Sequence, residues 1–276
     1  MLKLSRIPAS AAIGIVLTAA FVFAAVFAPW IAPYGEGEIV GSLWQPFSAQ
    51  HVLGTDNLGR DLLSRMIYGA RTTLFIAALA TALSFTMGSI VGFTAAVVGG
   101  WIDQVMSRLV DLLMSIPTLI FALVVLSVLP ANTLTLVLVM GVLDSTRVYR
   151  LARAVAVDIN VMDFVEAAKL RGEGRGWIIF REILPNALSP LVAELGLRFI
   201  FAVLFLSALS FLGLGVQPPE ADWGGMVKEN KEGIVFGIPA ALIPAAAIAL
   251  LAISVNLVAD WILNRTTDLK GGRGNG

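Results

Sequence analysis

The chain has 276 residues, of which 58% are hydrophobic and 14% are charged, and its 19 basic and 19 acidic residues give a formal net charge of zero. Because soluble domains carry about 25% charged residues, this deficit and the apolar runs of roughly 20 residues predict an integral membrane protein. The neutral balance gives no support to a nucleic-acid partner, the absence of cysteine excludes disulfides and thiol chemistry, and one histidine, His51, excludes a histidine-rich metal cluster.

The first apolar run covers residues 9–32 and follows two basic residues, Lys3 and Arg6. It is longer than a signal-peptide core, and no clear small-residue cleavage site follows it. We therefore expect a retained transmembrane helix whose N-terminus lies inside the cell. With the polar segment after it, this helix forms the expected first part of the chain, residues 1–72.

Residues 34–71 are more polar than their neighbours and are expected outside the membrane. We expect Asp56 to cap a turn there, and Arg60 and Asp61 to hold the loop by ion pairing, although such a cluster of charges also admits an active site. The lone histidine is expected to lie on the surface or pack rather than bind a ligand. Residues 61–68 place their apolar side chains on one face, which predicts a short interfacial helix.

The second and third spans are predicted at residues 73–98 and 101–129. In the second, Gly88 and Gly92 are spaced as a pair of small residues four apart, which suits close helix packing in lipid. In the third, Pro117 is expected to kink the helix.

Charged residues are expected near the inner ends of the third and fourth spans. Asp111 and Arg108, three residues apart, predict an ion pair. The fourth span begins at residue 134 and continues as a helix toward the cytoplasm, where its basic end is expected to meet lipid phosphates. The charged residues of this extension are Asp144, Arg147, Arg150 and Arg153.

A polar stretch at residues 163–190 lies between long apolar segments. We expect Asp163 to be the N-cap of a short helix, Glu166 to reach back to the cap N–H, and Gly172 to end the helix. A second short helix with one apolar side is expected at residues 177–184, ending before the next proline. Two short helices joined by glycine predict a docking site for another protein; the alternative is an ordinary interfacial loop.

The last two spans are predicted at residues 191–216 and 234–263. Glu194 and Arg198 have the favourable i,i+4 order, so we expect a structural ion pair there rather than a proton relay. The glycine-rich residues 266–276 predict a flexible cytoplasmic tail.

The distribution of basic residues predicts the orientation of the chain. Thirteen basic residues fall in the segments expected inside, five fall in those expected outside, and Arg198 lies in a span. The positive-inside rule then places both termini and the polar stretch at residues 163–190 in the cytoplasm.

Three motifs resemble those of one family of transport proteins. The polar stretch resembles the EAA loop of bacterial ABC importer permeases, and residues 53–61 and 210–215 (SFLGLG) resemble stretches of the dipeptide, oligopeptide and nickel importer permeases, the second permease of each pair. The resemblance extends from about residue 53 to residue 260. Many members carry a glutamate shortly before SFLGLG, where this chain has Leu206 or a near neighbour. If that glutamate lines the pathway, the substrate choice of this chain differs from that of the dipeptide members.

The resemblance implies an all-α integral membrane protein with six transmembrane helices in the MetI-like fold of type I ABC importer permeases. Its core is expected at residues 73–265, with the cytoplasmic coupling loop at residues 158–190. The residues expected to couple to the ATPases are Glu166, Ala167, Ala168, Gly172, Trp177, Ile183, Leu184 and Pro185. Those of the periplasmic motif are Gly54, Thr55, Asp56, Gly59, Arg60 and Asp61.

The same resemblance implies an assembly in the bacterial cytoplasmic membrane. The expected partners are a second homologous permease, two ATP-binding subunits, a periplasmic or lipid-anchored solute-binding protein and membrane lipid, with no nucleic acid. Because the ATPases bind ATP and Mg, this chain is expected to hold no cofactor, no metal and no catalytic site, and not to be an enzyme.

Peptides are the favoured solute, because residues 54–61 and 210–224 look most like the peptide group. A nickel chelate or a sugar is the alternative within the same type of importer. An ion-driven secondary transporter is less favoured, because no internal repeat is visible and the charges are expected at the ends of the spans.

Overall fold

The computed structural model describes residues 8–130 and 132–271, and the side chains through Leu263. Over these residues the chain is helical, and its extended segments form only two isolated β-bridges. The all-α class is therefore confirmed. The elements are α1 (Ala9–Val26), α2 (Ala28–Ile31), α3 (Leu62–Val98), α4 (Gly100–Ser115), α5 (Thr118–Val128), α6 (Thr133–Asn160), α7 (Asp163–Leu170), α8 (Arg175–Trp177), the π-helix η1 (Ile178–Ile183), α9 (Leu184–Leu212), α10 (Trp223–Asn230), the 3₁₀ segments η2 (Lys231–Phe236) and η3 (Pro239–Ala241), and α11 (Leu242–Gly271).

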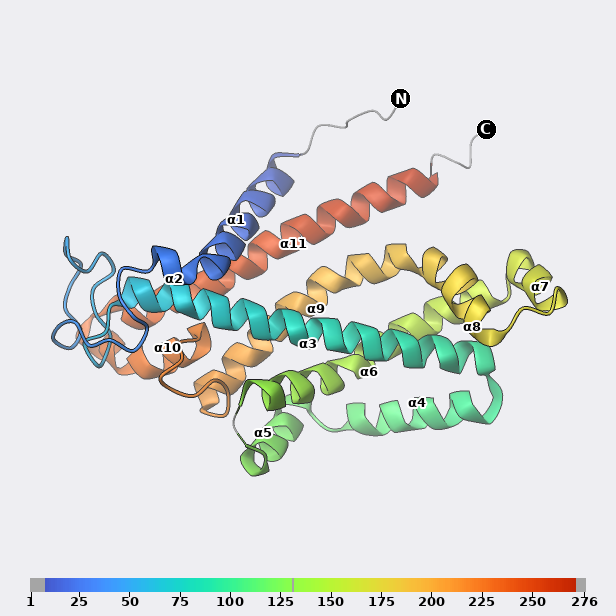
Figure 1. Cartoon of the computed structure of the whole chain (residues 1–276), viewed down its shortest axis with the longest axis horizontal. Helices are drawn as coiled ribbons and strands as arrows, with labels where there is room; N and C mark the ends of the chain where they lie inside the picture. The colour runs from blue at the N-terminus through green and yellow to red at the C-terminus, as the bar shows by residue number, and fades with distance from the viewer. Residues whose placement is uncertain (1–7, 131, 272–276) are drawn as a thin grey trace.

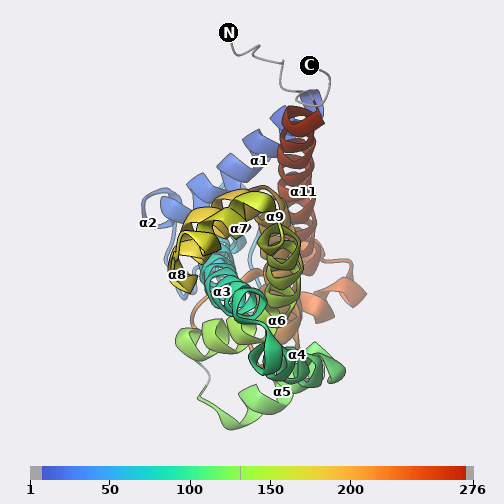
Figure 2. The same ribbon diagram turned by 90° about the vertical axis from the view of Figure 1, so that its right-hand side faces the viewer.

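The long helices run roughly along one axis of the molecule (Figure 1). The irregular segment before α3 gathers with α10 at one end, and α7, α8 and the turn between α3 and α4 lie at the other end. Helix α1 leaves the bundle beside α11 (Figure 2). There Gly14 lets the two helices approach closely, and Thr18 donates a hydrogen bond to Ser254 (3.2 Å).

Four helices in the described part of the chain are long and apolar enough to cross a membrane. They are α1, α3, the continuous helix Arg175–Leu212 and the helix Pro239–Leu263, and the α4–α5 pair adds a fifth if its two halves form one span. Helix α6 has 28 residues but carries charged residues along its length. The composition of the helices thus supports four or five spans, and the expected six are not established by it.

Helix α3 joins two elements that the sequence analysis separated. The interfacial helix expected at residues 61–68 and the span at 73–98 form one helix of 37 residues. Gly69, which lies between the two predicted segments, is buried against the indole of Trp223. At 1.5 Å per residue the helix is about 55 Å long, so it extends well beyond a hydrocarbon layer of about 30 Å.

The most extensive helix packing is between α3 and α6. A Cβ atom at Gly88 would lie 2.7 Å from the backbone oxygen of Ser145, and one at Gly92 would lie 2.8 Å from that of Tyr149. Only a residue without a side chain allows the backbones this near. The predicted role of the two glycines in close packing is confirmed.

The third span is broken rather than kinked. Helices α4 and α5 meet at an angle of 86° around Ile116 and Pro117. The predicted pair between Asp111 and Arg108 is not formed: Asp111 accepts from Arg150 on α6 (3.0 Å) instead. An arginine N-terminal to its acid is the less favourable order within a helix, and α6 offers a better-placed guanidinium.

Helix α11 continues to Gly271, so residues 266–271 of the expected flexible tail are helical. The basic residues Lys3, Arg6 and Arg273, which were counted as inside, lie outside the described residues.

Candidate functional site

Helix α7 forms the outer surface of the expected coupling loop. Its N-cap is Met162, whose extended backbone (φ −77°, ψ 148°) starts the helix without a side-chain hydrogen bond. The expectation that Asp163 is the N-cap and that Glu166 completes a capping box is therefore wrong. Both acids lie in the first turn instead, where they interact favourably with the positive end of the helix dipole.

Gly172 ends α7 as predicted. Its φ of +82° is a left-handed conformation that favours glycine. The N–H of Gly172 donates to the carbonyl of Lys169 (3.0 Å), and the N–H of Glu173 donates to that of Ala168 (3.2 Å). This pair of hydrogen bonds is a Schellman motif, which satisfies the last carbonyls of the helix and turns the chain sharply.

The second expected helix does not end before Pro185. Helix α8, the π-helix Ile178–Ile183 and α9 are continuous, so one helix runs from Arg175 to Leu212. Pro185 stands in the first turn of α9, directly after the π-helix. The wider π turn accommodates a proline, which has no N–H to donate, and the helix continues into the span.

The loop has a buried side and an exposed side. Val165, Ala168 and Ile183 are fully buried, and Val165 and Ile183 belong to an apolar cluster with α6 and with Phe93 of α3. Of the remaining coupling residues, Leu184 is partly buried, and the others, Glu166, Ala167, Gly172, Trp177 and Pro185, are exposed. The exposed apolar residues beside them are Val161, Met162, Phe164, Leu170 and Phe180. We call this exposed set the docking face.

The opposite end of the molecule holds residues 53–61, which read LGTDNLGRD, in a buried ionic network. Asp56 accepts hydrogen bonds from the N–H groups of Leu58 (2.8 Å) and Arg60 (3.0 Å), which confirms that it caps the turn. Its carboxylate also binds the guanidiniums of Arg60 (2.7 Å) and Arg65 (2.5 Å). Glu229 of α10 binds the same two arginines, each at 2.7 Å. Arg65 and Glu229 were not predicted: Arg65 stands one helical turn beyond the motif, and Glu229 lies far from it in sequence.

Burial raises the pKa of Asp56, but the hydrogen bonds from Arg60 and Leu58 and the charges of the arginines outweigh it, so the pKa stays below its usual value. The motif therefore carries an ionised carboxylate whose partners are all structural. Asp61 is the N-cap of α3 and accepts from Ser64 (2.8 Å), and it also contacts Nδ1 of His51 (3.0 Å). His51 is buried, which excludes the surface alternative.

The other motif residues shape the loop. Gly54 and Gly59 have φ values of +75° and +79°. A Cβ atom at either would lie within 2.3 Å of a backbone oxygen, so no other residue fits. Thr55 accepts from the N–H of Gln45 and donates to the carbonyl of Ser42, each at 2.7 Å. The contacts of the motif residues thus hold the shape of the loop before α3.

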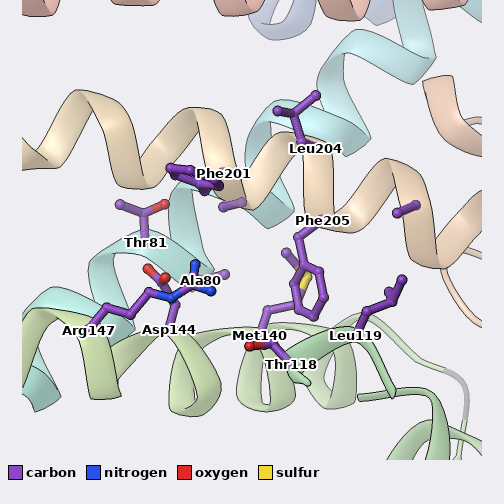
Figure 3. Close-up of a pocket in the computed structure, with 12 residues that line it drawn as sticks. Ala80, Thr81, Thr118, Leu119, Met140, Asp144, Arg147, Phe201, Leu204 and Phe205 are labelled. Atoms are coloured by element: carbon purple, nitrogen blue, oxygen red, sulfur yellow. The ribbon is translucent and has the colours of Figure 1, made fainter. Parts of the chain in front are cut away.

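Between the two ends, a cavity of about 340 Å³ lies among α3, α5, α6 and α9 (Figure 3). Arg198 binds Glu194 (2.7 Å), as predicted, and also Asp144 of α6 (3.3 Å), which was not predicted. Asp144 and Arg147 line the cavity together with Phe201. Within the helices these charges are not terminal, because α6 and α9 extend beyond them in both directions.

Comparisons with known proteins agree on one family. A family model described as the binding-protein-dependent transport system inner membrane component matches residues 84–268. The dipeptide transport system permease protein DppC of Alkalihalophilus pseudofirmus is 32% identical over 254 residues, which are 91% of this chain and 83% of that protein. The di/tripeptide transport system permease protein DppC of Pseudomonas aeruginosa is 34% identical over 256 residues, 90% of this chain and 84% of that protein.

A third relative, the probable D,D-dipeptide transport system permease protein DdpC of Escherichia coli, is 32% identical over 274 residues, 99% of this chain and 91% of that protein. Because the family model covers most of the chain and these relatives match it over more than four fifths of their length, the chain belongs to the binding-protein-dependent transport system inner membrane components, the permease subunits of ABC importers, which are membrane subunits and not enzymes.

Proposed function

We propose that this permease imports peptides, either dipeptides or longer ones. The observation that carries the proposal is the set of relatives, which are named for dipeptide, di/tripeptide or D,D-dipeptide transport and match at least 90% of this chain. The matched region includes both the outer motif and the loop with the docking face.

The proposed topology has six spans, namely α1, α3, the broken pair α4–α5, α6, α9 and α11. The charges of α6 do not oppose this count, because Asp144 and Arg147 near its middle line a cavity, where Asp144 pairs with Arg198 of α9. Residues 1–72 supply the first span and the outer segment, residues 73–265 the core, and residues 266–276 the cytoplasmic end. Both termini and α7 are proposed to lie in the cytoplasm, as the basic residues predict.

The docking face is proposed to bind a cleft of a partner ATPase. Its exposed residues are large and apolar, as Leu170 (83% exposed) and Phe180 (61% exposed) show. Apolar groups of this size at a water-exposed turn favour a protein partner. The coupling role of Glu166, Ala167, Ala168, Gly172, Trp177, Ile183, Leu184 and Pro185 belongs to this proposal.

The continuity of the helix from Arg175 to Leu212 supports direct coupling. No loop separates the docking face from α9, so a displacement of η1 moves the inner half of the span with it. Closure of the ATPase pair on ATP would then shift the path between two states, inward-open and outward-open.

The complete importer is proposed to contain a second homologous permease that supplies the other half of the path. Two ATP-binding subunits hold ATP and Mg, and a periplasmic or lipid-anchored solute-binding protein delivers the peptide to the outer end.

The test is ATP hydrolysis and solute uptake by the co-expressed complex in lipid vesicles, with and without its solute-binding protein. A peptide mixture, a nickel chelate and a sugar mixture are compared at equal concentration. Stimulation of both activities by peptides alone supports the proposal. Stimulation by the chelate or by the sugars would show that this compound, and not a peptide, is the solute. Uptake that follows a proton or sodium gradient without ATP would overturn it.

A further inference from the structure

The cavity among α3, α5, α6 and α9 lies near the middle of α6 and of α9. At 1.5 Å per residue, Asp144 and Arg147 are about 17 and 21 Å from the start of α6, and Phe201 is about 17 Å from the end of α9. A hydrocarbon layer is about 30 Å thick. Charged residues at this depth face a water-filled space or a protein partner rather than lipid, and they mark transport pathways.

The charges in this group are unequally engaged. Arg198 holds Glu194 and Asp144, and Ser84 of α3 donates a hydrogen bond to the second oxygen of Asp144 (3.3 Å). Arg147 forms no ion pair or hydrogen bond with any side chain that the structure describes. Its guanidinium carbon lies 5.8 Å from the ring centre of Phe201, and the residue is exposed while lining the cavity.

Arg147 is therefore the unpaired cation of the cavity. The other three charged residues, Arg198, Glu194 and Asp144, sum to one negative charge, so the group of four is neutral, and Arg147 is the member whose guanidinium donates to no side chain that the structure describes. A cation held beside an aromatic ring in a partly enclosed site attracts an anionic group, and a guanidinium binds a carboxylate through two parallel hydrogen bonds.

The rest of the cavity wall is mostly apolar, with Thr81 and Thr118 as its other polar residues. Figure 3 shows Met140, Leu119 and Phe205 gathered on the side away from Arg147. A ligand that fits both parts has a carboxylate next to an apolar body. We propose that Arg147 is a specificity-determining residue of the translocation path, which binds the C-terminal carboxylate of the peptide while the apolar wall receives its side chains. This inference rests on the proposed function.

The first experiment compares uptake of the dipeptide Ala-Phe with that of its C-terminal amide by the whole complex in vesicles. The solute-binding protein is the same for every permease variant, so differences between variants report on the permease. Arg147→Met is expected to lower uptake of the free acid about tenfold and leave the amide unchanged, and Arg147→Lys to retain part of the preference. The matched control is Arg150→Met, which removes an arginine of α6 that faces Asp111 outside the cavity.

The second measurement does not depend on turnover. Because the chain has no cysteine, Thr118→Cys places one thiol in the cavity wall for a hydrophilic thiol reagent. Ala-Phe is expected to slow the labelling more than its amide does, and the added Arg147→Met is expected to make the two equal.

The outcomes separate the inference from the proposed function. If the wild type imports peptides and Arg147→Met takes up acid and amide in the same ratio as the wild type, the inference alone is overturned. The same holds if Ala-Phe and its amide protect the introduced thiol to the same relative extent with and without Arg147→Met. Absence of peptide uptake by the wild type, with another solute imported, overturns both. Equal loss in Arg147→Met and Arg150→Met shows a general effect of charge and also contradicts the inference.

Discussion

Substitution of Gly172 tests whether the turn after α7 couples the permease to its ATPase. The φ of +82° suits glycine, and a Cβ built there would meet no atom within 4 Å. The cost of Gly172→Val is therefore one of backbone conformation, about 1–2 kcal/mol for an L-residue and more for a β-branched one. A change of this size alters the ratio of the closed to the open form of the turn about 5- to 30-fold. This is enough to open the Schellman turn and misplace Leu170 on the docking face.

The assay is the number of peptides imported per ATP hydrolysed by the reconstituted complex, with assembly measured by co-purification of the ATPases. We expect Gly172→Val to lower this ratio severalfold while the complex still assembles in part. Gly172→Asn is expected to have a smaller effect, because asparagine tolerates positive φ.

The control is Gly176→Ala, two residues into the next helix, where the φ is not positive and the space around a Cβ is also open. Alanine there is expected to stabilise the helix by about 0.5–1 kcal/mol and leave coupling intact. A normal transport ratio in Gly172→Val, or an equal loss in Gly176→Ala, would refute the reasoning.

Three further predictions concern stability, measured as thermal unfolding of the purified chain in detergent. Gly88→Leu places a side chain 2.7 Å from the backbone of α6 and is expected to cost about 1–3 kcal/mol, whereas Ala82→Leu on the exposed face of the same helix should cost little; equal midpoints would contradict the packing argument. Arg65→Met removes an arginine that is 1% exposed and leaves the carboxylates of Asp56 and Glu229 with Arg60 alone, which is expected to cost about 3–5 kcal/mol, against a small effect for the exposed Arg71→Met. Burial raises the pKa of Asp222 to about 6, although the N–H groups that it caps oppose the shift. Between about pH 4 and pH 6 the folded chain therefore keeps a proton on Asp222 that the unfolded chain has lost. The free energy of unfolding falls by about 3 kcal/mol as the pH rises from about 4 through 6. Asp222→Asn keeps a capping oxygen and should be more stable than the wild type at pH 7.5 but not at pH 4.5; parallel pH profiles would show that the carboxyl does not titrate in this way.

The sequence predicted most of what depends on local chemistry. The apolar runs located the helices because a chain in lipid must pair its backbone groups internally. Gly172 was assigned correctly as a helix stop, Asp56 as a turn cap, and Glu194 with Arg198 as an ion pair. The motifs of the outer segment and the EAA-like loop indicated the family, which the comparisons confirm.

The errors concern places where tertiary contacts override a local signal. Pro185 ends a helix in isolation, but a π turn and packing of Ile183 in the cluster beneath it keep this helix continuous. Asp111 was paired with the nearest arginine in sequence, whereas an arginine of α6 lies closer in space. Met162 starts α7 because the chain enters from α6 in an extended conformation there, so the better capping residue is not used.

What the sequence by itself determined is the class of the chain, its family, and the residues of its local turns, since these follow from hydrophobic length, residue spacing and the backbone freedom of glycine. Only the tertiary structure decided which charges meet. Glu229 reaches Arg65 across 164 residues, and Asp144 reaches Arg198 across 54. Ion pairs of this kind depend on which helix faces pack together, and helix periodicity does not encode that choice. The unpaired Arg147 and its cavity therefore became visible only when α3, α6 and α9 were placed side by side.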